Sequence, residues 1–382
     1  MGVRAPRRDG RRRARGRGPG RLVRRRRRGA RPRRRVVGPG RGRRWSARGR
    51  WPARRLPSSH PRRGLMPVRT VSGPGPSVPD LLAAKGATTV SVVIPARDEE
   101  ATVGDVVAGV RRAWVEDVPL LDELVVIDSD STDRTAEVAR AAGATVHAAA
   151  EVLPGLGPAR GKGEALWKAL HVTSGDVLVF LDADLVEWGT HFVSGLLGPL
   201  LTDPGVALVK AVYDRPLLDA EGREAETGGR VTELVARPLL ALHHPELAGL
   251  VQPLAGEWAV RRSAFERFSV PVGYGVEIAA LVDTAALLGA DAVAQVDLGR
   301  RTHRHHRHDT LGPMAVQVLA AVEARLGRGV DAAAGVADGR ATLTQYERTA
   351  EGFTPRPREV DLAERPPAVT VEGYATRTET VR

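Results

Sequence analysis

The sequence predicts an α/β fold in which helices flank a mostly parallel sheet, followed by a more helical C-terminal half. Short runs of β-branched apolar residues end at prolines, glycines or acidic residues, a pattern typical of buried strands. Segments of about 10–15 residues with helical character separate these runs. Strands that alternate with helices of this length form parallel sheets, because each helix returns the chain to the edge where the next strand starts.

The first two strands show how each element is predicted. In VSVVIPARDEE (90–100), Pro95 closes a β-branched apolar run, so the strand is expected to end there. Residues 122–144 continue with a second strand, a polar turn and a helix. Ser131 or Thr132 supplies a hydroxyl that can cap the helix N-terminus, and a glycine closes the helix.

The same criteria predict the remaining elements in order. In the first half, we expect helices over 101–113, 161–175 and 190–201, and strands over 145–149, 176–184 and 205–216. In the second half, we expect helices over 228–244, 273–290 and 312–326, a strand and helix over 253–268, and a strand with a basic loop over 291–308. Residues 330–382 are polar and weakly patterned, so we expect an extended or mobile tail.

Charge is distributed unevenly along the chain. The 382 residues carry a net charge of +13, but the first 70 hold 28 Arg and one Asp, a net of +27, which leaves −14 for the remainder. Together with the predicted elements, this divides the chain into an arginine-rich head, a linker, a first α/β half, a more helical second half and a polar tail, at 1–70, 71–88, 89–215, 216–328 and 329–382.

The head has two interpretations. It has almost no periodicity and few core-forming residues, so we expect it to be disordered. A dense arginine tract could bind nucleic acid or another anionic surface. We favour the alternative that it is a dispensable or misassigned start, because Met66 lies just before the first segment with a folded pattern.

Composition excludes several classes of protein. Cysteine is absent, so disulfides, thiolate metal sites and a cysteine nucleophile are excluded. No apolar run approaches the roughly 20 residues that span a bilayer, and no apolar segment of a secretory signal follows the basic start. We therefore expect a protein of the cytoplasm with no membrane span.

Three polar clusters follow predicted strands, where parallel sheets bind ligands. They are Pro95–Glu100, Asp128–Asp133 and Asp182–Asp184. In the third cluster, VFLDADL places two aspartates at the end of an apolar run, and such a pair is costly to bury unless a positive group neutralises it. The pair could hold a divalent cation against a phosphate, work as an acid and a base, or cap the next helix.

Basic residues near this pair offer partners. GRRTHRHHRH contains His303 just after a predicted strand, so His303 is the best-placed second metal ligand, although the segment could also be a solvated basic loop. Lys162 lies at a helix start in RGKGEALWKAL, where backbone N–H groups and its ammonium can hold an anion, or it could simply face solvent. The segment is not a Walker motif, because Leu156 stands at the first glycine position and Gly163 follows the lysine.

Two glycine-led segments in the second half could also contact a ligand. In GGRVTE, Arg230 can grip a carboxylate or phosphate and Thr232 adds a hydroxyl, unless the segment is only a loop with a helix cap. GYGVE places Tyr274 and Glu277 at another helix start. Glu277 there either complements the helix dipole or faces a ligand.

These segments together resemble the actinobacterial glucosyl-3-phosphoglycerate synthases, retaining transferases with the Rossmann-like GT-A fold. The order of VSVVIPARDEE, VVIDSDSTDRT, RGKGEALWKAL, VFLDADL, GGRVTELVARPLL, PLAGEWA, GYGVEIAALVDT and AQVDLGRRTHRH carries the resemblance over roughly residues 88–328. It implies a retaining transfer of glucose from UDP-glucose to the 2-hydroxyl of 3-phosphoglycerate, dependent on Mg²⁺ or Mn²⁺, by a homodimer.

The resemblance also implies that residues 89–215 are the nucleotide-sugar-binding half and residues 216–328 the acceptor-binding half, and it implies roles for individual residues. Asp184 and His303 would bind the metal, and Glu277 is the best candidate for a catalytic carboxylate beside Asp184. The nucleotide-sugar site would comprise Pro95, Ala96, Glu99, Ser129, Lys162, Asp182, Ala183, Asp184, Tyr274 and Glu277. The acceptor site would comprise Gly229, Arg230, Val231, Thr232, Arg301 and His305.

The sequence departs from the family pattern at three positions. Arg97 stands where a small apolar residue is usual, Asp130 replaces a frequent glycine, and His305 replaces an asparagine near the acceptor. Alternative functions are a related GT-A transferase that uses GDP-mannose or a polyprenyl phosphate, and a nucleic-acid-binding protein led by the arginine-rich head. Whether a protein nucleophile takes part in the retaining reaction is left open.

Overall fold

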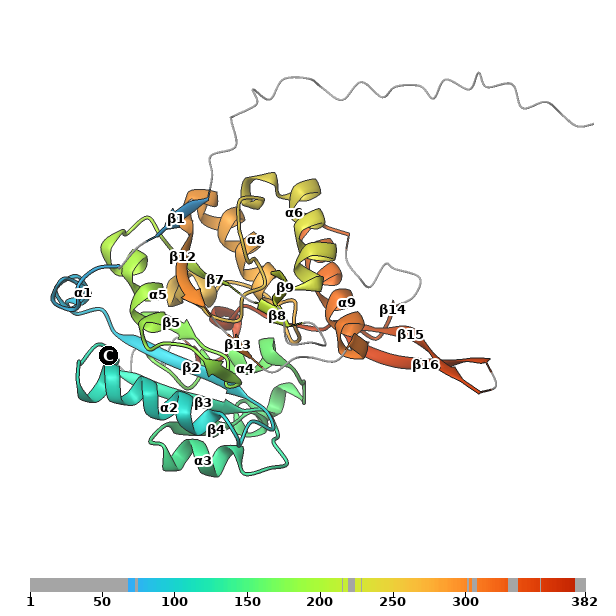
Figure 1. Cartoon of the computed structure of the whole chain (residues 1–382), viewed down its shortest axis with the longest axis horizontal. Coiled ribbons are helices and arrows are strands. Elements are labelled where there is room, and N and C mark those ends of the chain that lie inside the picture. The colour runs from blue at the N-terminus through green and yellow to red at the C-terminus, as the bar shows by residue number, and fades with distance from the viewer. Residues whose placement is uncertain are drawn as a thin grey trace, which may run out of the picture. The chain divides into compact units, whose positions relative to one another are not determined.

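An eight-stranded sheet forms the centre of the computed structural model (Figure 1). The structure describes residues 68–72, 75–214, 216–218, 224–227, 229–300, 302–303, 308–328, 336–350 and 352–374. In spatial order the strands are β1 (Arg69–Val71), β12 (Val293–Arg300), β7 (Leu208–Asp214), β10 (Trp258–Arg261), β5 (Val177–Phe180), β2 (Val90–Ala96), β3 (Glu123–Asp128) and β4 (Thr145–Ala148). Only β10 runs antiparallel to its neighbours in this sheet, so the predicted mostly parallel sheet is confirmed.

The central strands are apolar on both faces because helices cover both sides of the sheet. Val92 packs into one core and the adjacent Val93 into the other, and both are fully buried. On β5, Leu178 packs into the same core as Val93, and Val179 packs into the same core as Val92. This arrangement explains why the strands are continuous apolar runs rather than alternating ones.

Two groups of helices supply these cores. One core is built with α1 (Val78–Lys85), α2 (Val103–Arg111), α3 (Thr135–Ala141) and α5 (His191–Thr202). The other contains α4 (Lys162–Ala169), α6 (Arg237–His243), α7 (Arg262–Phe265), α8 (Val276–Leu288) and α9 (His308–Arg325). None of the helices in the described ranges is both long and apolar enough to cross a bilayer.

Shorter helices complete the described elements. Two π-helices, η1 (Arg112–Glu116) and η4 (Thr232–Ala236), adjoin α2 and α6. The 3₁₀ turns are η2 (Ala149–Glu151), η3 (Pro154–Leu156), η5 (Pro245–Leu247), η6 (Ala290–Ala292) and η8 (Ala368–Thr370). The π-turns change the helix geometry locally at positions where sequence periodicity predicted continuous helix.

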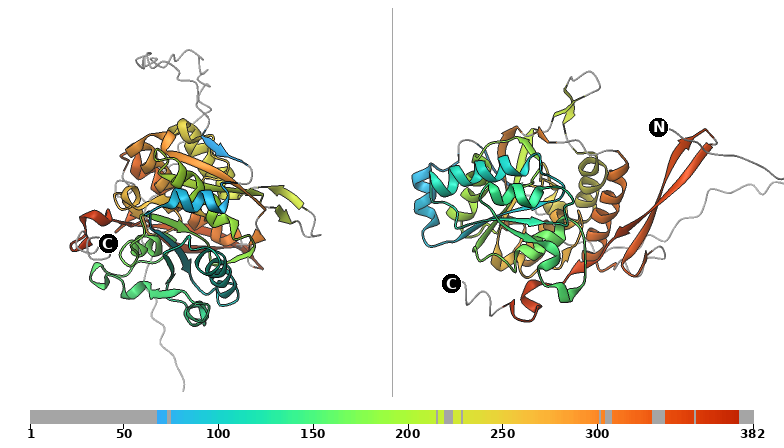
Figure 2. Two further views of the ribbon diagram at one scale, coloured as in Figure 1. Left: turned by 90° about the vertical axis from the view of Figure 1, so that its left-hand side faces the viewer. Right: turned by 90° about the horizontal axis from the view of Figure 1, so that it is seen from below.

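Small sheets are added around the central one. They pair β6 (Leu185–Glu187) with β13 (Thr302–His303), β8 (Pro216–Leu218) with β9 (Glu224–Thr227), and β11 (Val270–Pro271) with β17 (Glu364–Arg365). A fourth small sheet contains β14 (Val336–Ala337), β15 (Arg340–Thr349) and β16 (Gly352–Asp361). Strands β15 and β16 form the long hairpin that extends past α9 in Figure 2.

This hairpin corrects the expectation of a weakly structured tail. Its two strands pair in register over ten residues each, and the chain then packs back against the body, where Val360 and Ala368 are buried. The residues of β15 alternate between exposed and half-buried, so the apolar signal of a buried strand is missing from the sequence. The described part of the tail, residues 336–350 and 352–374, is therefore extended, as expected, and it forms regular strands rather than a mobile segment.

The two expected halves share the central sheet. Strand β10 lies between β5 and β7, and β12 pairs with β7 on its other side. Residues 61–382 accordingly form one compact unit. The interleaving brings second-half residues against the strand ends of the first half.

Candidate active site

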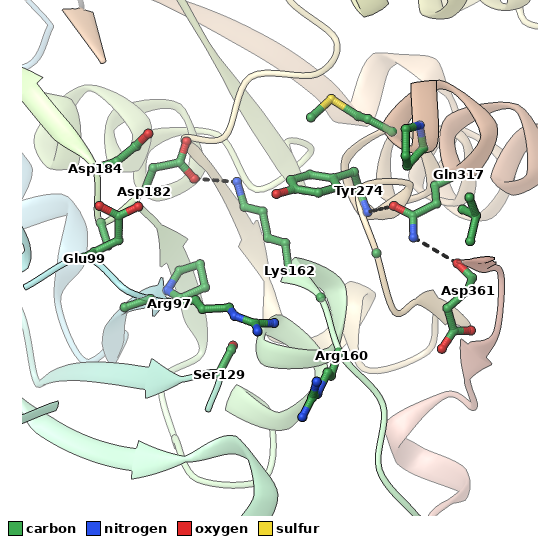
Figure 3. A pocket seen from close by; sticks show the side chains of 18 of the residues that line it. Arg97, Glu99, Ser129, Arg160, Lys162, Asp182, Asp184, Tyr274, Gln317 and Asp361 are labelled. Atoms are coloured by element: carbon green, nitrogen blue, oxygen red, sulfur yellow. Dashed lines mark hydrogen bonds and ion pairs between the residues drawn. The ribbon is translucent and has the colours of Figure 1, made fainter. Parts of the chain in front are cut away.

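A pocket of about 500 Å³ opens at the C-terminal ends of β2, β3 and β5 (Figure 3). Nine of the residues predicted for the nucleotide-sugar site line it: Pro95, Ala96, Glu99, Ser129, Lys162, Asp182, Ala183, Asp184 and Tyr274. They come from five separate segments of the chain. The structure therefore brings together most of the predicted donor-site residues, as expected for polar clusters at one edge of a parallel sheet.

Two loops on one side of the pocket are tied to each other. The Ser131 hydroxyl accepts a hydrogen bond from the Asp98 N–H at 2.9 Å, and the Asp98 carboxylate accepts one from the Thr132 N–H at 2.7 Å. Ser131 and Thr132 thus fix the loop after β2, and the prediction that one of them caps α3 is wrong. The helix begins instead at Thr135, whose N–H donates to the Asp133 carboxylate at 2.9 Å.

Two aspartates in these hydrogen-bonded loops have strained backbone conformations. Asp98 and Asp130 have φ values of 55° and 59°, in the left-handed region that aspartate tolerates better than most residues. Several hydrogen bonds between the loops hold this geometry, including that from the Glu99 N–H to the Thr135 hydroxyl at 2.7 Å. The pocket rim formed by Pro95, Glu99 and Ser129 is therefore preorganised.

Lys162 is the positive group that neutralises the buried carboxylates. Its Nζ lies 2.5 Å from Oδ1 of Asp182 and 3.0 Å from Oε1 of Glu277, and it is almost fully buried with Glu277. Burial alone would lower the pKa of Lys162, but the charges of Asp182 and Glu277 outweigh burial and hold the pKa well above its ordinary value. Lys162 therefore stays protonated and is held toward the base of the pocket.

Glycines allow the start of α4 to approach the turn before α8. A Cβ on Gly161 would meet the Val272 carbonyl oxygen at 2.5 Å, and one on Gly163 would overlap the Pro271 carbonyl. This close contact lets the Glu164 N–H donate to the Val272 carbonyl at 2.9 Å. The sequence GKG is thus required by packing, and the packing places Lys162 beside the turn that carries Tyr274.

A second buried ionic layer lies behind Lys162. Lys210 on β7 is buried, donates to the Ala255 carbonyl at 2.5 Å and lies 5.5 Å from the centre of the Trp258 ring. The Tyr213 hydroxyl donates to the Glu257 carboxylate at 2.8 Å. Burial lowers the pKa of Lys210 to about 7, although the charge of Glu277 opposes the shift.

The predicted metal ligands are neighbours at the level of the backbone. Asp184 lines the pocket immediately before β6, and β6 pairs with β13 so that His303 lies opposite Leu185 in register. A carboxylate and an imidazole form a donor set that suits a divalent cation such as Mn²⁺. Among the residues whose side chains are described there is no cluster of three or more potential metal ligands, and the His303 side chain is not one of these.

The four predicted acceptor residues that the structure describes, Gly229–Thr232, do not line this pocket. Val231 and Thr232 are buried at the start of η4, next to the half-buried Gly229 and Arg230. Arg301 and His305 lie outside the described residues. The acceptor site therefore stays a prediction.

Sequence reasoning missed part of the pocket wall. The missed lining residues are Arg160, Gly161, Gly273, Pro313, Met314, Gln317, Arg358, Glu359, Val360 and Asp361, and Arg97 was noted only as a departure from the family pattern. Most belong to α9 and β16, which are distant in sequence from the strand ends. The tail is polar and weakly patterned, so no signal in the sequence indicates that its residues reach the pocket.

The pocket can bind an anionic ligand through a cation and fixed positive groups. Acidic side chains line the pocket, the ammonium of Lys162 pairs with one of them, and Gly161 and Lys162 place the N-terminus of α4 at the pocket wall. A volume of about 500 Å³ is ample for a nucleotide or a sugar. The arrangement suits a nucleotide diphosphate held by a metal.

Comparison with known proteins points to the same chemistry. The sequence profile of Glycosyl transferase family 2 matches residues 91–266. The glucosyl-3-phosphoglycerate synthase of Mycolicibacterium smegmatis is 47% identical over 298 residues, which cover 78% of this chain and 95% of the relative.

Crystal structures of the Mycobacterium tuberculosis glucosyl-3-phosphoglycerate synthase are similar in fold. The complex with Mn²⁺, UDP-glucose and phosphoglyceric acid is 43% identical with a TM-score of 0.68, and the match covers 79% of this chain and 98% of that one. The complex with Mg²⁺ and UDP has a TM-score of 0.69 at the same identity, with 78% and 98% coverage.

Proposed function

The chain belongs to the glucosyl-3-phosphoglycerate synthases, and we propose that the pocket at the ends of β2, β3 and β5 is where it transfers glucose from UDP-glucose to 3-phosphoglycerate. It is a metal-dependent hexosyltransferase that uses Mg²⁺ or Mn²⁺. The observation that carries the assignment of the pocket is the convergence of nine predicted donor residues on one cavity with Lys162 at its base.

UDP-glucose is proposed to lie along the pocket with the uridine at the preorganised rim. Pro95, Ala96 and Ser129 form a surface for the base and ribose, where Glu99 adds an acceptor. The glucose would then lie at the other end of the pocket, toward Tyr274 and toward Glu277, which does not line the pocket but pairs with the Lys162 ammonium behind it. Asp182 and Ala183 fall between these ends, next to the ribose and the diphosphate.

Asp184 and His303 are proposed to hold the metal. When bound, a divalent cation acts as a Lewis acid for the diphosphate leaving group. Lys162 adds a fixed positive charge near the same position, and its two carboxylate partners keep it protonated. Fixed charge stabilises the leaving diphosphate without reorganisation during the reaction.

The acceptor is proposed to bind with its phosphate and carboxylate on Gly229–Thr232, Arg301 and His305. Arg230 can bind either anionic group in a forked geometry. Transfer to the 2-hydroxyl with retention is proposed, in which positive charge develops on the sugar ring. Glu277 is a buried carboxylate at the sugar end, so it is suited to stabilise that charge while it also positions Lys162.

Arg230→Ala tests the acceptor assignment. If Arg230 binds the acceptor anion, the KM for 3-phosphoglycerate rises about tenfold or more, whereas the Kd for UDP stays within about twofold. Steady-state kinetics and calorimetry measure the two quantities. Equal weakening of both ligands would contradict the acceptor assignment. Separately, NMR of the product shows its anomeric configuration and so tests whether the transfer retains it.

The homodimer and the cytoplasmic location are proposed as well. Leu234 and Leu242 are 76% and 75% exposed near the start and the end of the η4–α6 segment, and apolar surface of this kind is common at subunit contacts. A nucleotide-sugar donor and a phosphorylated acceptor are consistent with a cytoplasmic enzyme. Sedimentation of the purified enzyme distinguishes a monomer from a dimer.

A further inference from the structure

A single amide on α9 joins two walls of the donor pocket. The Oε1 of Gln317 accepts a hydrogen bond from the Tyr274 N–H at 3.0 Å, and its Nε2 donates to the Asp361 carbonyl at 2.9 Å (Figure 3). Tyr274 lies in the turn before α8, and Asp361 ends β16 of the C-terminal hairpin. Gln317 therefore connects the turn to a segment that lies far from it in the sequence. Such a long-range contact leaves no pattern in the sequence.

The turn is shaped to receive this amide. A Cβ on Gly273 would overlap the Gln317 amide, so only glycine fits there without displacement. A Cβ on Gly275 would meet the side chain of Ala321 at 2.8 Å and the Gln317 carbonyl oxygen at 2.9 Å. Both glycines of the Gly-Tyr-Gly turn are thus in contact with α9.

The opposite side of the turn rests on α4. The Gly163 N–H donates to the Gly273 carbonyl at 3.3 Å, beside the close approach of Gly161 to Val272. The turn is therefore held between the helix that carries Lys162 and the helix that carries Gln317. A shift of α9 would move Tyr274 and the start of α8, where Glu277 lies in the first turn.

We propose that Gln317 is a positioning residue that fixes the sugar end of the donor pocket by holding the Gly-Tyr-Gly turn against the C-terminal hairpin. Tyr274 lines the pocket, and Glu277 is 3.0 Å from Lys162, so the turn sets the position of both. The hairpin residues Arg358–Asp361 line the same pocket, so one amide couples two of its walls. The inference rests on the proposed placement of glucose beside Tyr274.

Two substitutions at Gln317 separate positioning from simple packing. Gln317→Leu keeps the approximate volume and removes both hydrogen bonds, whereas Gln317→Glu keeps the acceptor for the Tyr274 N–H. In the presence of Mn²⁺ and without acceptor, Gln317→Leu raises the Kd of UDP-glucose roughly tenfold and that of UDP less than about twofold. Gln317→Glu gives an intermediate value, because it retains the contact with the turn.

Gln295→Leu is the matched control. Gln295 is a buried glutamine that also joins separate segments, through the Val251 N–H at 2.9 Å and the Thr70 hydroxyl at 2.8 Å, but it does not line the pocket. This variant lowers the melting temperature and leaves both Kd values and kcat unchanged. If Gln317→Leu behaves in the same way, or weakens UDP and UDP-glucose equally, the positioning role is contradicted.

The comparison of the UDP-glucose and UDP affinities does not depend on which acceptor the enzyme uses. If the wild-type enzyme forms no product with 3-phosphoglycerate, the proposed function fails, yet the ratio of UDP-glucose to UDP affinity still decides the role of Gln317. With product formed, a fall in kcat of Gln317→Leu at unchanged KM for 3-phosphoglycerate supports the role. A rise in the acceptor KM alone would overturn it.

Discussion

At the scale of single residues, the site depends on how its carboxylates are neutralised. Asp182 and Glu277 share the ammonium of Lys162, whereas Asp184 lies two residues after Asp182, beside the strand pair that contains His303. The two aspartates of VFLDADL therefore have different surroundings. Asp182 belongs to a protein ion-pair cluster, and Asp184 is the carboxylate proposed for the metal.

Asp184→Ala is expected to lower kcat/KM roughly a thousand-fold, as for removal of a preorganised electrostatic group. The fold should survive, because the half-buried Asp184 lines the pocket and is not a residue of the apolar core. Asp214→Ala is the control, since Asp214 also ends a strand but is exposed and does not line the pocket. Full activity of Asp184→Ala, measured with saturating Mg²⁺, would contradict the metal assignment.

Lys210 predicts a dependence of stability on pH. Burial lowers its pKa to about 7, from an ordinary value of 10.5, in a cluster with Glu277, Lys162, Glu257 and Asp182. Between these values the unfolded state binds more protons than the folded state, so this group makes the free energy of unfolding rise with pH across that window. The cost of burying the charged lysine is present in full below about pH 7.

Lys210→Met should remove this rise. Denaturant unfolding of both proteins from about pH 6 to 10 gives the difference in the free energy of unfolding at each pH. The variant is expected to gain most over the wild type near neutral pH, and the difference should shrink as the pH increases. A difference that stays constant with pH would show that Lys210 does not titrate in this range.

At the scale of elements, the C-terminal segment supports the helix that carries Lys162. Arg365 forms two hydrogen bonds with the buried carboxylate of Glu164, at 2.6 and 2.8 Å, and lies 5.6 Å from the Trp167 ring centre. The Trp167 indole N–H in turn donates to the Pro366 carbonyl at 2.7 Å. These contacts anchor α4 from a point about 200 residues later in the chain, the kind of non-local contact that sequence patterns do not show.

Arg365→Met is expected to lower the free energy of unfolding by about 3 kcal/mol, because it removes one partner of a buried carboxylate. The loss of stability is limited because the Nζ of Lys168, 3.0 Å from Oε1 of Glu164, still neutralises that carboxylate. The control is Arg356→Met, whose ion pair with Glu347 is exposed on both sides and is expected to contribute less than about 1 kcal/mol. Similar losses in both variants, measured by urea unfolding, would contradict the anchoring role.

The elements show which features the sequence could reveal. Strands β2, β3 and β5 were predictable because their apolar runs end at polar clusters, and parallel topology places those clusters at one edge. The antiparallel orientation of β10 could not be predicted, since WAVR has the same apolar character in either direction. The contribution of β16 and α9 to the pocket depends on long-range packing that leaves no periodic signal.

For the candidate site too, the sequence indicates individual residues but not the long-range contacts between them. Lys162 could be predicted as an anion-binding residue from its place at a helix start, but its pairing with Glu277 depends on the approach of α4 to the turn before α8. Gln317 carried no sequence signal, because a glutamine within an amphipathic helix is usually a surface residue. Its role follows from the hairpin that folds back against α9.

At the scale of the whole molecule, the catalytic unit is expected to begin near Met66. The described lining residues of the pocket start at Pro95, and the first described strand, β1, pairs with β12 along the edge of the sheet. A chain of residues 66–382 should therefore retain full activity. The matched control is a chain that begins at residue 75. It lacks β1, which pairs with β12, and should therefore be less stable than residues 66–382.

The central claim is that this pocket transfers glucose from UDP-glucose to 3-phosphoglycerate with a bound divalent cation. The most direct measurement is product formation by residues 66–382 with both substrates and Mg²⁺, with and without a chelator, followed by mass spectrometry and ³¹P NMR. The account predicts glucosyl-3-phosphoglycerate that disappears with the chelator and returns with excess Mg²⁺. Product that is unaffected by the chelator, or turnover of UDP-glucose only with a different acceptor, would contradict it.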